Sequence, residues 1–250
     1  VVSRGELIKI GGGFRIPDIL TVAGAYLREV GTTNNTSLDD FVRATSSNTA
    51  AWLSVHRSNF IMEGFVHTPT IKELYPASVS SGIPLIVDLG SGAVSPTDFR
   101  TTLPREPMPQ EAIAKGAALV CFSGDKLFGG PQSGIVIGQS QLIERLKKNP
   151  LFRALRVDKI TLSLLQQIVD IQIDSAATTP LQAMINIPLN ELTKKFPQLE
   201  ANILGVIRND KFLILKKNDV MKKNDKTYVI INSVQMQQTL LAFGHEEKIS

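Results

Sequence analysis

The sequence predicts an α/β protein with a mostly parallel sheet flanked by helices, followed by a small C-terminal α+β appendage. Three observations lead to this fold class. Short apolar segments alternate with amphipathic segments over residues 1–165. The apolar segments are continuous, as in strands that are buried on both faces. Beyond about residue 185 the composition changes toward lysine and asparagine.

The amphipathic and apolar segments can be assigned in chain order. Helices are expected at residues 16–30, 36–47, 68–82 and 109–117. Strands buried on both faces are expected at residues 50–56, 83–90 and 117–123. A further strand at 130–138, a helix at 139–149 and a long helical continuation at 151–174 follow. Ser37 with Asp40, and Thr70 with Glu73, have the spacing of capping boxes at two helix starts.

The last quarter of the chain differs in composition from the rest. Before Lys194 there are ten arginines and seven lysines, whereas from Lys194 onward there are nine lysines and one arginine. This segment predicts two or three short strands joined by Asn-Asp turns, then a helix ending at Gly244. We therefore expect two domains, residues 1–185 and residues 186–250.

Composition limits the function classes. A net charge of +4 would suit an anionic substrate, but the charge by itself does not identify the class of substrate. No apolar run approaches the roughly 20 residues that cross a bilayer, and the N-terminus lacks a signal-peptide pattern, so a cytoplasmic protein without membrane insertion is expected. The single cysteine, Cys121, lies in the apolar run "AALVCFS" and is expected to be an inert buried residue. No His/Cys cluster has metal-ligand spacing, so no metal site is expected.

The stretch "CFSGDKLFGGP", residues 121–131, is the strongest chemical signal. Lys126 leaves a buried strand and enters a loop with Gly129 and Gly130, where a backbone without side chains can approach a planar cofactor. A lysine with a lowered pKa can form a Schiff base, which points to pyridoxal phosphate. Asp88, at the end of "IPLIVDLG", is placed to pair with the pyridine nitrogen. The alternatives are a solvated loop lysine and a turn aspartate.

Several motifs together resemble the bacterial L-seryl-tRNA(Sec) selenium transferase family. They are "VVSRGELIKIGGGFRIPDI", "VGTTNNT", "VHRSNF", "VDLGSGA", "CFSGDKLFGGPQSGIVIG" and "NPLFRALRVDKITL", in consistent order over residues 1–194. The resemblance implies a fold-type-I pyridoxal-phosphate enzyme that converts seryl-tRNA(Sec) to selenocysteinyl-tRNA(Sec). It also implies selenophosphate as the selenium donor and a homo-oligomer with sites shared between subunits.

The resemblance assigns roles to residues around the lysine. Lys126 matches the Schiff-base lysine and Asp88 the partner of the pyridinium. Asp125 matches the acidic residue before the lysine, which orients the amine or assists proton transfer. Ser123 matches a contact to the cofactor phosphate, with a serine that caps backbone at a strand end as the alternative. His56 in "VHRSNF" either stacks on the cofactor ring or satisfies a buried hydrogen bond.

Arginines complete the expected site. Arg153 and Arg156 match a pair that binds the anionic selenium donor, and their i, i+3 spacing places both on one helical face. A solvated basic face is the alternative. Arg4 in "SRGE" and Arg15 in "FRIP" also lie in motifs like those of the family, and they are weaker candidates for binding the anion.

The resemblance also predicts an incomplete enzyme. The family's N-terminal tRNA-recognition region and part of the cradle for the cofactor phosphate have no counterpart before Val1. From about residue 186 the sequence resembles the C-terminal RCK-type domain of Trk potassium-uptake regulators, which suggests a composite or a fusion. Two other functions stay open: a related pyridoxal-phosphate lyase on a small amino or sugar acid, and a non-catalytic regulatory or ligand-binding module.

Overall fold

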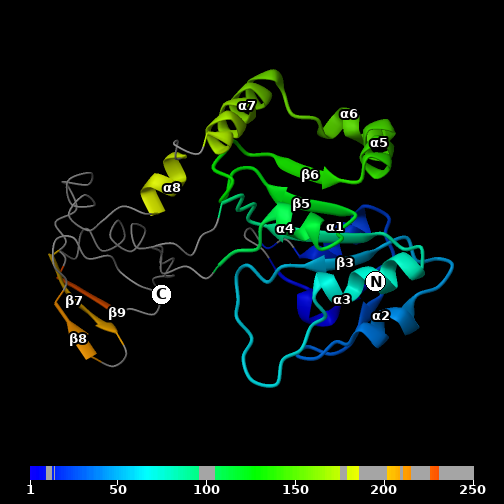
Figure 1. Ribbon diagram of the computed structural model, residues 1–250, viewed down its shortest axis with the longest axis horizontal. Helices are drawn as coiled ribbons and strands as arrows, with labels where there is room; N and C mark the ends of the chain where they lie inside the picture. The colour runs from blue at the N-terminus through cyan, green and yellow to red at the C-terminus, as the bar shows by residue number, and fades with distance from the viewer. Residues whose placement is uncertain are drawn as a thin grey trace. The chain divides into compact units, whose positions relative to one another are not determined.

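The computed structural model describes residues 1–9, 13, 15–95, 105–174, 179–185, 202–208, 211–214 and 226–230 (Figure 1). The chain divides into two compact units. The first comprises Val1–Ser95 and Pro107–Ala177, and the second comprises Pro96–Glu106 and Thr178–Ser250. All candidate site residues belong to the first unit.

A six-stranded sheet forms the centre of the first unit, in the order β2-β1-β3-β4-β5-β6. Its strands are β1 (Val2–Ser3), β2 (Glu29–Val30), β3 (Trp52–Val55), β4 (Leu85–Gly90), β5 (Leu119–Ser123) and β6 (Gly134–Gly138). The pairs from β2 to β5 are parallel, and only β6 runs antiparallel to its neighbour. The mostly parallel sheet confirms the predicted fold class. Its parallel strands have their carboxyl ends at one edge, where α/β proteins bind ligands.

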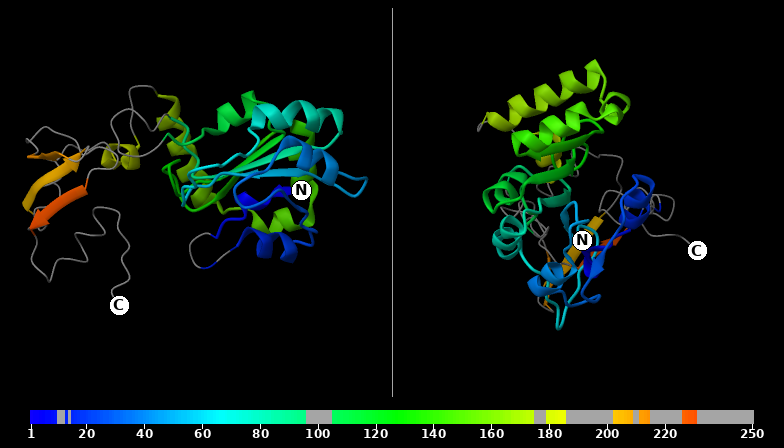
Figure 2. Two further views of the ribbon diagram at one scale, coloured as in Figure 1. Left: turned by 90° about the horizontal axis from the view of Figure 1, so that it is seen from below. Right: turned by 90° about the vertical axis from the view of Figure 1, so that its right-hand side faces the viewer.

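Helices lie on both sides of this sheet (Figure 2). They are η1 (Arg4–Glu6), α1 (Ile16–Val22), α2 (Leu38–Ala44), α3 (Ile71–Ser80), α4 (Pro109–Ala114), α5 (Ser140–Lys148), α6 (Pro150–Leu155) and α7 (Lys159–Ile173). Both predicted capping boxes are present, at the starts of α2 and α3. At α3 the Thr70 hydroxyl accepts the Glu73 N–H at 3.3 Å, and the Glu73 carboxylate accepts the Thr70 N–H at 2.7 Å.

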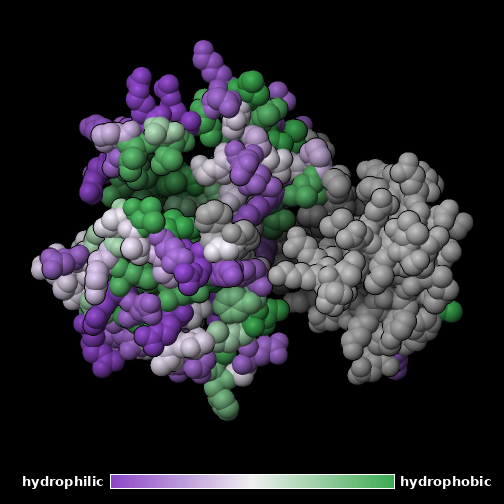
Figure 3. Space-filling view, turned by 180° about the vertical axis from the view of Figure 1, so that it is seen from behind, coloured by the Kyte–Doolittle hydropathy of each residue, from purple (hydrophilic) through white to green (hydrophobic). Residues whose placement is uncertain are grey.

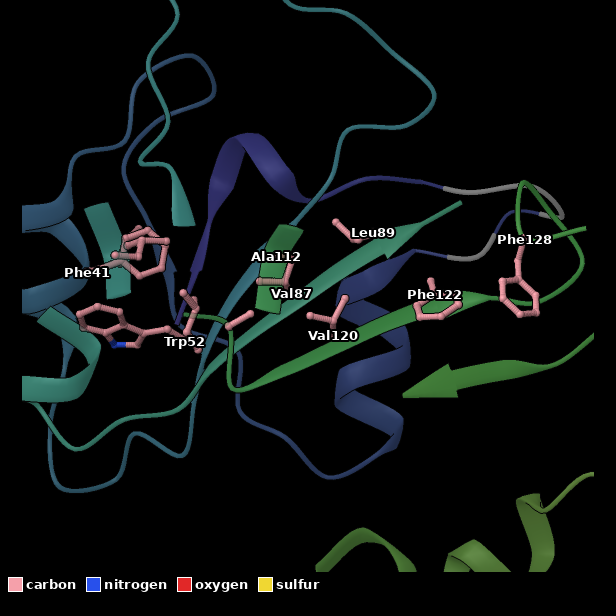
Figure 4. Close-up of a cluster of buried hydrophobic side chains, with 12 residues drawn as sticks. Phe41, Trp52, Val87, Leu89, Ala112, Val120, Phe122 and Phe128 are labelled. Atoms are coloured by element: carbon pink, nitrogen blue, oxygen red, sulfur yellow. The ribbon is translucent and has the colours of Figure 1, made fainter. Parts of the chain in front are cut away.

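The main core lies on one face of the sheet (Figure 4). Trp52, Val87 and Val120 from three adjacent strands are at most 2% exposed, and Phe41 of α2 packs edge-on against Trp52 with ring centres 5.5 Å apart. Burial along β4 alternates, because Leu85, Val87 and Leu89 face this core while the intervening residues are only half-buried. The prediction of strands buried on both faces was therefore wrong for β4, whereas Val55 of β3 and Leu119 of β5 are buried on the second face.

Two predicted helices have different limits in the structure. The helix expected at 16–30 ends at Val22, because Gly24 takes a positive φ of 80° that closes the helix. Glu29 and Val30 instead pair with β1 as strand β2.

The continuous helix expected at 151–174 is interrupted. Arg156 and Asp158 are extended, with ψ of 138° and 176°. The Asp158 carboxylate accepts the N–H of Thr161 at 2.8 Å and caps the start of α7. The capping aspartate makes the separate helices α6 and α7 more favourable than one long helix.

The second unit contains α8 (Pro180–Ile185) and an antiparallel sheet in the order β8-β7-β9. These strands are β7 (Asn202–Arg208), β8 (Lys211–Leu213) and β9 (Lys226–Ile230), which confirms the strands predicted for the tail. The predicted Asn-Asp turns and the helix ending at Gly244 lie outside the described residues. Within the described ranges, no helix has both the length and the apolar character to cross a membrane.

Candidate active site

A tight turn after β5 presents Lys126. Inside the turn, Gly130 donates to the Gly124 carbonyl at 2.7 Å and Gly129 donates to the Lys126 carbonyl at 2.8 Å. The N–H of Leu127 donates to the Ser91 carbonyl at 2.9 Å, which ties the turn to the segment that follows β4. Lys126 itself is exposed, so its amine extends from a fixed backbone.

The glycines of this turn are required by geometry. Gly129 has a positive φ of 80°, which side chains other than glycine adopt only with strain. A Cβ on Gly124 would collide with Ser133, and one on Gly130 would lie 3.1 Å from the Gly124 carbonyl oxygen. Beneath the turn, Phe128 packs against Phe122 with ring centres 5.9 Å apart (Figure 4). Packing and hydrogen bonds together fix the position of the lysine.

Asp88 lies near the carboxyl end of β4, next to the lysine turn. Its carboxylate accepts the N–H of Gly90 at 3.1 Å. Burial raises the pKa of the Asp88 carboxyl, while the Gly90 hydrogen bond and the charges of Lys126 and His56 oppose that rise. The structure therefore brings Asp88 into electrostatic contact with two other predicted site residues.

His56 follows β3 and reaches the same edge of the sheet. Its backbone N–H donates to the carbonyl of Asp88 at 2.8 Å, so the two residues are adjacent across β3 and β4. Since β3, β4 and β5 are parallel neighbours, their carboxyl ends carry His56, Asp88 and the lysine turn side by side. Ser123 is the half-buried last residue of β5, and Asp125 is exposed beside Lys126.

Arg4 and Arg15 are exposed and engaged with acidic neighbours. Arg4 Nε lies 3.1 Å from Glu29 Oε2, and Arg15 Nε lies 2.7 Å from Asp18 Oδ2. Exposed pairs of this kind contribute little to stability and exchange readily with solvent.

Arg153 and Arg156 are also exposed, at the end of α6. The N–H of Arg156 still donates to the Phe152 carbonyl at 2.9 Å, so the pair stays one helical turn apart, as the spacing predicts. Figure 1 shows α6 beside α5, beyond the Gly138 end of β6, whereas the lysine turn joins the opposite end of that strand. The structure does not bring the arginine pair to Lys126 within one chain.

Sequence reasoning missed Glu6. This residue ends η1 and is 5% exposed, and its carboxylate accepts the N–H of Val55 at 2.9 Å. Burial raises the pKa of Glu6 to about 7, against the opposing hydrogen bonds and the charges of Arg57 and His56. The available signal was an acidic residue three positions after the short strand-like "VVS", within the motif "SRGE" in which only Arg4 was singled out.

The second face of the sheet borders a cavity of about 1190 Å³. Leu53, Ile86, Asp88 and Cys121 line it from the strands, and α1 lines it from the other side. Burial, together with the Asp88 charge, raises the pKa of the Cys121 thiol to about 11. A half-buried thiol that stays protonated at neutral pH agrees with the prediction of an inert cysteine.

Solved structures show the same fold. A D-glucosaminate-6-phosphate ammonia-lyase aligns with a TM-score of 0.60 and 20% identity, over 93% of this chain and 55% of that one. An aspartate aminotransferase from Thermus thermophilus aligns with a TM-score of 0.50 and 14% identity, over 81% of this chain and 51% of that one. The fold is that of the large domain of fold-type-I pyridoxal-phosphate enzymes.

Sequence comparison then gives the family. The family model described as "SelA: L-seryl-tRNA selenium transferase" matches residues 1–222, so the chain belongs to this family. An L-seryl-tRNA(Sec) selenium transferase from Mannheimia succiniciproducens is 42% identical over 87% of this chain and 47% of its own length. The enzyme of the same name from Escherichia fergusonii is 52% identical over 66% of this chain and 36% of its own length.

The chain spans about half the length of the curated relatives it matches, or less. The family match continues to residue 222, past the domain boundary predicted near residue 185. The resemblance of residues 186–250 to an RCK-type domain stays a prediction, as does the boundary.

Proposed function

We propose that this chain contributes the pyridoxal-phosphate-binding part of a selenium transferase that converts L-seryl-tRNA(Sec) to selenocysteinyl-tRNA(Sec) with selenophosphate. The observation that carries the proposal is the convergence of Lys126, Asp88 and His56 at three adjacent strand ends. Membership of the transferase family supplies the substrate class.

The residues at this edge fit pyridoxal phosphate. A covalently held aldehyde cofactor needs an amine that can reach it, and Lys126 is exposed on a fixed turn. A protonated pyridine nitrogen needs an acidic partner, and Asp88 lies on β4, between the strands that precede His56 and Lys126. Bound there, pyridoxal phosphate supplies an electron sink for the carbanion formed at the seryl α-carbon. Ser123, at the end of β5, is proposed to contact the phosphate.

Each residue then has a stated task. Asp88 would hold the ring nitrogen in its protonated form. Lys126 would remove the proton from the seryl α-carbon, and Asp125 would orient the lysine amine or relay the proton. His56, whose backbone is fixed against β4, would stack on the ring.

The arginine pair is proposed to bind the anionic selenium donor at the site of a second copy of the chain. Two exposed guanidinium groups one turn apart suit an oxyanion. The placement of α6 away from the lysine turn supports a site shared between copies, and therefore a homo-oligomer. Arg4 and Arg15 are proposed as weaker contributors to the anion-attracting surface.

A cofactor titration tests the proposal. The chain is expected to develop a visible absorbance band with pyridoxal phosphate, because Lys126 holds the cofactor covalently. Lys126→Ala should abolish the band, while Lys115→Ala, which changes an exposed lysine in an ion pair with Glu111, should keep it. No band in saturating cofactor would contradict the proposal. Transfer of labelled selenium to seryl-tRNA(Sec) distinguishes the transferase from a lyase acting on a small amino or sugar acid.

A further inference from the structure

The chemistry proposed above makes no use of Glu6, although it is the most deeply buried carboxylate near the strand ends that form the site. Glu6 Oε2 accepts the Val55 N–H at 2.9 Å, and Glu6 Oε1 lies 3.4 Å from the Ser54 hydroxyl, which donates to it. Both partners lie at the carboxyl end of β3, directly before His56. Glu6 itself lies on η1, which follows β1, the neighbour of β3 in the sheet.

The Glu6 carboxylate accepts a hydrogen bond that a backbone carbonyl of β1 would accept in a regular parallel pair. Leu53 donates its N–H to the Val1 carbonyl at 2.9 Å, as in a parallel pair. Two residues later the N–H of Val55 faces the same neighbour but donates to the Glu6 carboxylate, where β1 gives way to η1. A buried N–H that loses its acceptor is costly in a protein interior.

The end of β3 is thereby held from both sides. On the β4 side, Val55 pairs with Asp88, and the His56 N–H donates to the Asp88 carbonyl at 2.8 Å. On the β1 side, the Glu6 carboxylate accepts from Ser54 and Val55, and Val55 packs with Val2 and Ile8. The carboxylate therefore helps to hold the strand end that carries His56.

A backbone carbonyl would satisfy the Val55 N–H without the cost of burying a charge. The charges of Arg57 and His56 offset part of this cost. A buried carboxylate that costs stability next to a cluster of chemical groups is more common at functional sites than in structural cores.

We propose that Glu6 is a positioning residue for the lysine–aspartate site: it holds the end of β3 so that His56 lies against Asp88. The importance of this position for the cofactor rests on the function proposed above. The contact between Glu6 and β3 does not depend on that function, so the contact and the function can be tested separately.

The test combines amide hydrogen exchange on the cofactor-free full chain with circular dichroism of bound pyridoxal phosphate. Glu6→Ala removes the acceptor of the Val55 N–H, whereas Glu6→Gln keeps an uncharged acceptor of the same shape. Glu73→Ala is the matched control, because Glu73 also accepts a backbone N–H, from Thr70 at 2.7 Å, but at the start of α3. Glu6→Asp, whose carboxylate has a shorter reach, replaces the alanine variant if that variant does not fold.

Glu6→Ala is expected to speed exchange of the Val55 and His56 amides by about 10- to 100-fold, because the buried Val55 N–H loses its acceptor. It should also reduce the visible circular dichroism of the bound cofactor, which a purely structural contact would leave unchanged. Glu6→Gln should keep both signals near the wild type, whereas Glu73→Ala should speed exchange only near Thr70 and leave the cofactor signal unchanged.

In Glu6→Ala, unchanged exchange at Val55 and His56 would overturn the proposal, and so would faster exchange with an unaltered cofactor signal. If the wild type shows no cofactor band at all, the proposed function fails. The exchange of the His56 amide then decides by itself whether Glu6 holds the end of β3.

Discussion

Asp88 is the residue at which the strand ends β3, β4 and β5 interact. Its backbone carbonyl binds His56, its carboxylate binds Gly90, and its charge acts on Lys126. Burial raises its pKa, and the Gly90 N–H together with the charges of Lys126 and His56 opposes that rise. Such a balance suits a group that must pair with a protonated ring nitrogen.

Asp88→Asn tests this role. The amide cannot hold a positive ring nitrogen, so we expect the dissociation constant for pyridoxal phosphate to rise about tenfold or more. Absorbance titration of the variant measures this change, with Asp125→Asn as a comparison on the exposed turn. Equal affinity of Asp88→Asn and the wild type would show that Asp88 does not contact the cofactor.

Glu6 makes stability depend on pH. Its pKa in the folded chain is about 7, above its ordinary value of 4.5, so the folded state holds the proton more tightly. This contribution is fully present below about pH 4.5 and is lost as pH rises toward 7. Glu6→Gln has no proton to lose. From pH 5 to pH 8 the wild type should therefore lose about 2 kcal/mol of unfolding free energy relative to the variant.

Urea denaturation of both proteins at the two pH values measures this difference. Because every other titrating group is shared, its contribution cancels in the comparison. If the unfolding free energies of the wild type and the variant change in parallel with pH, Glu6 ionises in the folded chain at no cost in stability.

Among the elements, the helices with side-chain caps were the easiest to predict. The two capping boxes depend on residues three positions apart, which the sequence shows directly. The end of α1 and the break between α6 and α7 were missed, since Gly24 and Asp158 occupy positions where a helix could also have continued.

Thr70→Ala tests the contribution of a cap. Loss of the hydroxyl that accepts the Glu73 N–H should lower the unfolding free energy by about 1 kcal/mol. Lys72→Ala, an exposed position in the same first turn of α3, should change it by less than about 0.5 kcal/mol. Denaturant midpoints of the two variants give the comparison, and a larger loss for Lys72→Ala would contradict the importance of the cap.

At the scale of the whole molecule, the arginine pair raises the question of how many chains form a site. The arginine pair on α6 and the lysine turn lie apart in one chain, but they can meet when two copies associate about a symmetry axis. The shared site proposed above predicts that variants defective at different residues will complement one another.

Lys126→Ala and the double variant Arg153→Ala/Arg156→Ala are each expected to be inactive. Mixed oligomers of the two should regain about a quarter of the wild-type activity, because random association pairs an intact lysine with an intact arginine pair at that frequency. Selenium transfer by co-expressed variants measures the recovery. Inactive mixed oligomers would place the lysine and the arginine pair of each site on the same chain.

The sequence by itself predicted the fold class, the lysine turn and the placement of Lys126 and Asp88 at neighbouring strand ends. These follow from periodicity, from glycine spacing and from the rule that parallel strands end at one edge. Only the tertiary structure decided that Glu6 completes the edge of β3 and that α6 lies away from the lysine turn. Such facts depend on which segments, distant along the chain, become neighbours in space, and no local pattern of residues records that.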